Sequence, residues 1–369
     1  MKWLWFLSLL IVSSLSAASL AAAPLFTVRT VTYKGSLPYV ESGDVRRDAR
    51  VNHRIFLDQT GLPAPVKHSD GIKPLQNQES LAGSADFSFS VLRNDDRILT
   101  LEVQGEACGA YCENYSMRYN FDVATGRMIS ALDLFTHAGG AELFKQNLTK
   151  RVAEYEKAIT DLEKEAEINH KNTDKSKSEA EDDKERIEMT RSMYESCAEA
   201  MRSPDYGKYY SFADAHSLKI GSESITFVYG RCSNHAMRAL DDVGHQEITY
   251  KIADLAPYFT AYGKYLLMNG PQAAPRPEPY GQILQGRVGR ATITLALSEL
   301  NSDSSLGGSY FYGKYRVPIE LSGKVNGNII ELNEFGNGNS PAMIRATIKE
   351  GRLEGQWIGE QTLDFRVEP

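Results

Sequence analysis

The sequence has few cysteines and tryptophans, no excess of positive charge and no long apolar run beyond its start. Of 369 residues, four are cysteine and three are tryptophan. Lysine and arginine number 41 against 48 aspartates and glutamates, a net charge of −7 that argues against nucleic acid as the main partner. After residue 22 no apolar run approaches the roughly 20 residues that span a bilayer, so we expect no transmembrane segment in the mature chain.

Short motifs of common catalytic and cofactor sites are also missing. The sequence contains no H-E-x-x-H, G-x-S-x-G or S-x-x-K pattern, and its seven histidines lack zinc-ligand spacing. Residues 308–314 match the G-x-x-x-x-G-K spacing of a phosphate loop. However, Tyr315 replaces the required Ser or Thr, and the segment lies among predicted strands. We therefore predict a non-catalytic protein that uses no metal and no cofactor.

Residues 1–22 have the composition of an export signal. Lys2 supplies the positive start, residues 3–12 form the apolar run, and residues 19–23 are the small residues of a cleavage region. We expect cleavage after Ala21 or Ala22, because Pro24 disfavours a cut directly before it. The mature protein is therefore predicted to act outside the cytoplasm.

The four cysteines are Cys108, Cys112, Cys197 and Cys232. An even number in an exported chain favours disulfides. The closest pairing is Cys108 with Cys112, which leaves Cys197 for Cys232. The alternative is a metal or redox site. The C-x₃-C spacing and the lack of a histidine pair beside it make that alternative weaker.

The most strongly patterned part of the chain lies between residues 98 and 135. Leu99, Leu101 and Val103 alternate with polar residues, which is the period of a half-buried strand. Residues 115–121 repeat the alternation, and residues 122–127 then form a turn sequence around a glycine. We predict two strands joined by the loop between the first two cysteines.

This order of motifs resembles the extracytoplasmic domain shared by the lysozyme-sensing anti-sigma-V factor and a peptidoglycan deacetylase of Gram-positive bacteria. In that family a strand leads to a Gly-Gly-Ala-His turn, and a second strand ends in Asn-Phe-Asp-x-x-Thr-Gly and Leu-x-Asp-Leu-Phe. Here Asn-Phe-Asp at 120–122, Thr-Gly at 125–126 and Leu-Asp-Leu-Phe at 132–135 match. Tyr111 stands where the family has its histidine.

A second matching block lies downstream. Residues 225–229 and 246–259 look like the closing strands of the family, which end in a Leu-x-Pro-Tyr phrase. In the deacetylase the chemistry belongs to a separate metal-dependent domain, and nothing in this chain matches that domain. The resemblance therefore implies an α+β binding domain, with lysozyme or a similar muramidase as the first partner to test and Tyr111 as a contact. Together with the cysteines it implies a periplasmic location.

Residues 139–201 show a helical pattern. An apolar stripe recurs at steps of three and four, fades through residues 169–178 and resumes weakly afterwards; its first members are Phe144, Leu148, Val152, Tyr155, Ile159 and Leu162. We predict two antiparallel helices with a charged tip, inserted in the α+β domain of residues 24–267. Residues 45–57 are expected to form a further helix.

The composition changes after residue 267. Residues 268–281 are rich in proline and glycine and read as a linker. Residues 282–369 then show about eight short alternating strands, with Asn326-Gly327 and Glu350-Gly351 as hairpin turns. This pattern predicts a small all-β domain, either an up-and-down barrel or a curled sheet.

Two groups of side chains are candidate sites. Tyr310, Tyr312 and Trp357 are expected either to line a ligand-binding barrel mouth or to fill the barrel core. The predicted function is an exported cell-envelope protein that binds a protein, such as lysozyme, or a cell-wall glycan. The alternative is a peptidoglycan hydrolase with a site spread over the residues His235, His245, Asp241 and Asp242, which are otherwise ordinary surface residues. A structural or stress-related envelope factor without a small ligand is a third option.

Overall fold

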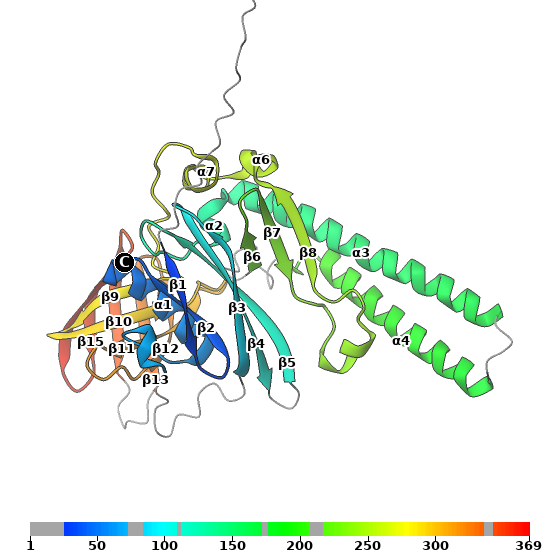
Figure 1. Cartoon of the computed structure of the whole chain (residues 1–369), viewed down its shortest axis with the longest axis horizontal. Coiled ribbons are helices and arrows are strands. Elements are labelled where there is room, and N and C mark those ends of the chain that lie inside the picture. The colour runs from blue at the N-terminus through cyan, green and yellow to red at the C-terminus, as the bar shows by residue number, and fades with distance from the viewer. Residues whose placement is uncertain (1–25, 73–83, 109–111, 172–175, 207–216, 336–341) are drawn as a thin grey trace, which may run out of the picture.

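The computed structural model of the protein describes residues 26–72, 84–108, 112–171, 176–206, 217–335 and 342–369 (Figure 1). The fold is α+β, with three small antiparallel sheets, helices and a closed eight-stranded antiparallel barrel at the C-terminal end. This architecture confirms the predicted fold class. In Figure 1 the barrel lies to the left, and a long helical hairpin projects to the right.

The α+β part contains the elements that precede the barrel. They are β1 (Thr27–Thr32), β2 (Ser36–Glu41), α1 (Val45–Thr60), η1 (His68–Asp70), β3 (Ser84–Asn94), β4 (Ile98–Cys108), β5 (Cys112–Asp122), α2 (Ala131–Leu134), α3 (His137–Lys171), α4 (Lys177–Arg202), β6 (Leu218–Ile220), β7 (Ser224–Tyr229), η3 (His235–Leu240), β8 (Gln246–Lys251), α6 (Ile252–Leu255), η4 (Ala256–Tyr258) and α7 (Ala261–Met268). The strands pair as β1-β2, β3-β4-β5 and β6-β7-β8.

Helix α1 packs against the sheet β3-β4-β5. The Asp44 side chain accepts hydrogen bonds from the first backbone amides of the helix, and Gly61 ends it in the left-handed conformation. Val51 and Ile55 lie on its buried face, against Leu101 of the sheet β3-β4-β5. The alternation that predicted strand β4 thus points its apolar side at this helix.

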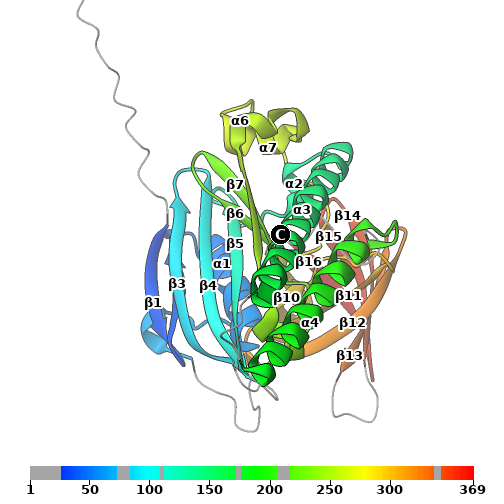
Figure 2. The ribbon, with the colours of Figure 1, turned by 90° about the vertical axis from the view of Figure 1, so that its right-hand side faces the viewer.

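The predicted helical hairpin is formed by α3 and α4 (Figure 2). Tyr155 and Tyr194 pack together between the helices, and ion pairs such as Arg191 with Glu163 (3.6 Å) also join the two helices. Neither these helices nor any other helix of the described residues combines the length and the apolar character needed to cross a bilayer.

The apolar stripe identifies only one of the two buried faces of α3. The stripe faces α4, but a second face carries the buried polar residues Asn147 and Arg151. Asn147 donates to the Tyr229 hydroxyl (2.6 Å), and Arg151 Nε donates to Gln246 Oε1 (2.8 Å), so that α3 packs on the sheet β6-β7-β8. This face is buried through hydrogen-bonded polar residues, so the spacing of apolar residues in the sequence does not reveal it.

The barrel is formed by eight strands in sequential order, with β16 pairing back to β9. They are β9 (Ile283–Val288), β10 (Ala291–Leu297), β11 (Ser305–Tyr312), β12 (Ile319–Asn326), β13 (Ile329–Phe335), β14 (Met343–Lys349), β15 (Arg352–Ile358) and β16 (Thr362–Glu368). It is therefore the up-and-down barrel, not the curled sheet. Buried apolar side chains fill its interior, among them Leu284, Leu295, Leu321, Ile330, Ile344 and Phe365.

Helix α1 also packs on the outside of the barrel. Leu57 of the helix forms a buried cluster with Ile283 and Phe311 of the barrel. The His53 ring meets the Phe311 ring edge-on at 5.1 Å, and its Nδ1 accepts a hydrogen bond from the Ala64 amide (3.1 Å). Burial lowers the pKa of His53 to about 3, with the nearby Arg316 charge as a smaller cause.

The buried His53 predicts a loss of stability in mild acid. The folded state resists protonation of this ring, whereas the unfolded chain binds the proton with a pKa near 6.5. Its contribution to stability is complete above that value and declines as the pH falls towards 3. We expect the His53 contribution to the free energy of unfolding to be about 1 kcal/mol smaller at pH 5.5 than at pH 6.5.

Urea unfolding of the wild type and of His53→Asn at both pH values checks this expectation. The asparagine side chain can still accept from the Ala64 amide but does not titrate, so the extra acid sensitivity should disappear in the variant. Equal pH dependence of the two proteins would contradict the assignment.

Candidate functional site

The predicted aromatic residues of the barrel meet at one of its ends. Tyr310 and Tyr312 on β11 and Trp357 on β15 point inward, and Glu334 on β13 lies between them. Glu334 Oε1 accepts hydrogen bonds from the Tyr310 hydroxyl and from Trp357 Nε1, both at 2.6 Å. We call these four residues the barrel mouth.

The barrel mouth has a buried floor and a more open rim. Tyr310 is 1% exposed, and burial together with its hydrogen bond to Glu334 raises the pKa of its hydroxyl well above the usual range. Tyr312 and Trp357 are half-buried, and the Tyr312 ring meets that of Tyr310 at 69° with centroids 5.5 Å apart. Two aromatic rings and a carboxylate are therefore held in fixed positions next to solvent.

Both disulfides are formed in the structure. Cys108–Cys112 closes the end of the β4-β5 hairpin with an S–S distance of 2.06 Å, and Cys197–Cys232 joins α4 to the segment before η3 at 2.02 Å. Glu106 lies near the first pair, but bonded sulfurs are not thiolates and offer no metal site. Tyr111, the predicted contact of this loop, lies outside the described residues.

The residues of the alternative hydrolase site are only partly brought together. Asp242 and His245 line one groove of about 710 Å³ between α3 and β8. Asp241 instead accepts from the Gly244 amide (2.9 Å) within its own turn. His235 begins η3, and its side chain lies outside the described part of the chain. Of the two adjacent aspartates, Asp242 lines this groove and Asp241 does not.

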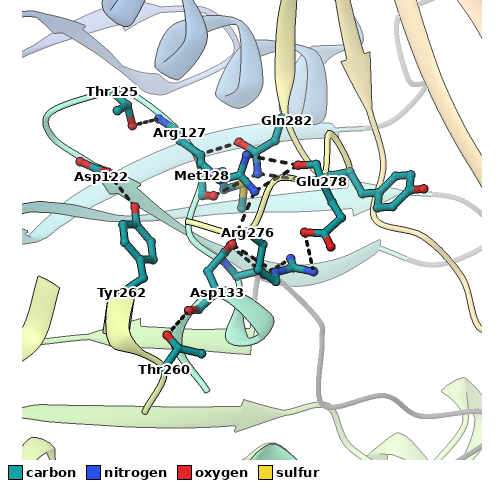
Figure 3. A network of polar contacts seen from close by, with 12 residues as sticks. Asp122, Thr125, Arg127, Met128, Asp133, Thr260, Tyr262, Arg276, Glu278 and Gln282 are labelled. Atoms are coloured by element: carbon teal, nitrogen blue, oxygen red, sulfur yellow. Dashed lines mark hydrogen bonds and ion pairs between the residues drawn. The ribbon is translucent and has the colours of Figure 1, made fainter. Parts of the chain in front are cut away.

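A polar network at the boundary between the α+β part and the barrel was not predicted (Figure 3). Asp133 of α2 is fully buried. Its carboxylate accepts hydrogen bonds from Arg276 Nε of the Pro-rich segment (3.2 Å) and from Arg127 Nη2 of the turn after β5 (3.5 Å). Arg127 also donates to the Glu278 carbonyl (3.2 Å). Gln282 exchanges two hydrogen bonds of 3.1 Å with the Met128 backbone.

This network gives the Pro-rich segment a fixed place. The sequence predicts that residues 268–281 are a linker between two domains. In the structure Arg276 and Glu278 attach the second half of this segment to the α+β part, and Gln282 does so directly after it (Figure 3). A cavity of about 400 Å³ adjoins the network and is lined by Arg50, Arg54, Arg127 and Arg276. These arginines are far apart in the sequence and form no local motif. Arg276, a charged residue between two prolines, was the one sequence signal that could have indicated the network.

Comparisons with known proteins leave the family open. No protein-family model and no curated protein matches the chain. A solved structure of a DUF3298 family member from Bacteroides fragilis aligns with 67% of this chain and 96% of its own, at 13% identity and a TM-score of 0.35. Such a distant likeness carries no argument about fold or function. The resemblance to the lysozyme-sensing and deacetylase family remains a prediction from the sequence motifs.

Proposed function

We propose that this protein is a non-catalytic binding protein of the bacterial cell envelope that recognises a cell-wall glycan at the barrel mouth. The observation that carries the proposal is the hydrogen bond from half-buried Trp357 to the Glu334 carboxylate, with the half-buried Tyr312 ring at the same barrel end. Mouths of β-barrels are a common place for small-molecule sites with aromatic walls and few polar groups.

The geometry suits a sugar more than a purely apolar ligand. Sugar rings offer C–H faces that pack on aromatic rings and hydroxyls that donate to a carboxylate. The hydrogen bond from Nε1 to Glu334 fixes the orientation of the Trp357 ring. A Cβ at position 359 would lie 2.4 Å from the indole, so glycine at this position is needed to make room for the ring. Fixed rings lose little entropy when a ligand binds.

An extracytoplasmic location supports the proposal. Disulfides persist in oxidising compartments, and the chain carries two, together with an N-terminal signal composition. Cell-wall glycans are then within reach. A protein partner such as lysozyme would instead contact the loop that contains Tyr111, and it is an alternative ligand in the test below.

The test uses the only tryptophan expected in the processed chain. Trp3 and Trp5 belong to the predicted signal, so fluorescence of the mature protein reports on Trp357. We expect soluble N-acetylglucosamine oligomers or muropeptides to change this fluorescence saturably. By calorimetry, Trp357→Ala should weaken binding at least tenfold, about 1.4 kcal/mol.

Tyr315→Ala is the matched control, because Tyr315 follows β11 at the same barrel end but is 66% exposed and lies outside the barrel mouth. It should bind as the wild type does. Trp357→Phe separates the ring from the Nε1 donor. The proposal fails if no wall glycan binds while lysozyme does, or if Trp357→Ala binds glycan unchanged.

A further inference from the structure

The arginine-lined cavity lies at the opposite end of the barrel from the barrel mouth. Gly351, just before β15, contributes to its wall, whereas Trp357 stands near the far end of the same strand. Its volume of about 400 Å³ is within the range of small-molecule sites. Met128 and Ile283 are among its apolar lining residues. A site here is therefore separate from the proposed glycan site.

The arginines around the cavity are unequally neutralised. Arg54 pairs with Asp58 on the same helix, and Arg276 and Arg127 share Asp133. Arg50 forms no ion pair with the described residues; its Nη1 donates to the Thr125 carbonyl at 2.8 Å. The one acidic residue of the wall, Glu350, pairs with Arg352 (3.1 Å).

Glu299 lies near Arg54, Arg127 and Arg276. Burial raises the pKa of its carboxyl, which reduces its value as a counter-charge. Among the described residues, Arg50 is therefore the guanidinium of this cavity without a carboxylate at ion-pair distance, and Asp44 and Glu368 act on it only from further away.

Two buried donors of the cavity have no acceptor. The Nε atoms of Arg50 and Arg127 are shielded from solvent and have no hydrogen-bond partner among the described residues. Arg127 as a whole is only 8% exposed. Buried charged donors without acceptors are rare, and each requires an explanation such as a bound water or ligand. Both residues line the cavity.

We propose that this cavity binds a small carboxylate-bearing molecule, with its carboxylate between Arg50 and Arg127 and its apolar part against Met128 and Ile283. A guanidinium presents parallel N–H groups that match the two oxygens of a carboxylate. A singly charged group suits a site with one uncompensated arginine, and the apolar wall favours an organic acid over inorganic phosphate. The ligand would also touch both the α+β part and the barrel.

The direct test observes the two Nε–Hε groups by ¹H–¹⁵N NMR of the mature protein. Acetate, benzoate and hippurate are titrated, with inorganic phosphate as the competing anion. We expect at least one of the organic acids to shift the Arg50 and Arg127 signals saturably, with benzoate or hippurate binding more tightly than acetate. Arg50→Gln should weaken this binding at least tenfold.

Arg46→Gln is the matched control, since Arg46 lies one turn earlier on α1, is exposed and does not line the cavity. It should leave the affinity unchanged. The Arg50 side chain is half-buried, so Arg50→Gln is expected to fold, and the remaining Arg127 signal reports on the site. Absence of a shift with all three acids, equal binding by Arg50→Gln, or tighter binding of phosphate would each overturn the proposal.

Discussion

Gly323→Ala is expected to lower the free energy of unfolding by at least about 3 kcal/mol, or to prevent the barrel from closing. Gly323 points inward from β12, and a Cβ there would lie 1.8 Å from the Glu331 carbonyl oxygen and 2.9 Å from Leu332 Cα. Both atoms belong to the backbone of β13, which cannot move away without loss of strand pairing. Glycines at inward positions allow the strong bending that a small barrel requires.

Gly307→Ala on the neighbouring strand β11 is the control for this prediction. A Cβ at Gly307 would meet only the Leu321 oxygen at 3.6 Å, an ordinary contact, so we expect a change within about 1 kcal/mol. Urea unfolding followed by Trp357 fluorescence measures both variants. If Gly323→Ala is as stable as Gly307→Ala, the prediction is wrong, and β12 and β13 can separate enough to accommodate a methyl group at position 323.

The barrel was predictable because its signals are local. Alternation of period two marks its strands, and Asn326-Gly327 and Glu350-Gly351 mark two of its hairpins; Gly327 and Gly351 do adopt positive φ (60° and 79°). Closure through the β9-β16 pair depends on the curvature of the whole sheet. Single residues such as Gly323 carry that curvature, and the sequence alone does not show which strand backbone approaches them.

The charged boundary between the two parts was not predictable for a different reason. Asp133 falls in a segment that reads as apolar, Leu-Asp-Leu-Phe at 132–135, and its partner Arg276 lies among prolines. Their separation of 143 residues leaves no spacing to recognise. Arg50 and Arg127 likewise have ordinary surroundings in the sequence. Ion pairs between distant segments become visible only after the surrounding elements have been placed.

The barrel mouth was predictable only in part. Tyr310, Tyr312 and Trp357 were selected from the sequence as either ligand contacts or core, and the structure brings them to one barrel end. Glu334, which joins two of them, was missed because a single glutamate in a strand is usually exposed. Inward-facing alternation with Ile330 and Leu332 was the signal that could have found it.

Asp133→Ala is expected to destabilise the protein by about 3–5 kcal/mol, because it removes the counter-charge of a buried arginine. Asp133 is fully buried, and besides the two arginines it accepts from the amide (2.9 Å) and hydroxyl (3.0 Å) of Ser130. Among the described residues, the Arg127 guanidinium would then keep the Glu278 carbonyl as its acceptor. Urea unfolding measures the loss, and hydrogen exchange of the Gly281 and Gln282 amides should become faster because Arg276 keeps only its contacts with Ser130 and Glu278.

Two further variants separate the charge effect from a general loss of packing. Asp161→Ala removes an exposed ion pair with Lys164 (2.9 Å) and should leave the free energy of unfolding close to that of the wild type, because solvent screens exposed charges. The double variant Asp133→Ala, Arg127→Met removes both charges, so it should recover part of the loss and be more stable than Asp133→Ala alone. If the double variant is instead the less stable of the two, the arginine does not depend on Asp133 as its counter-charge. The boundary network would then act through hydrogen bonds to backbone carbonyls.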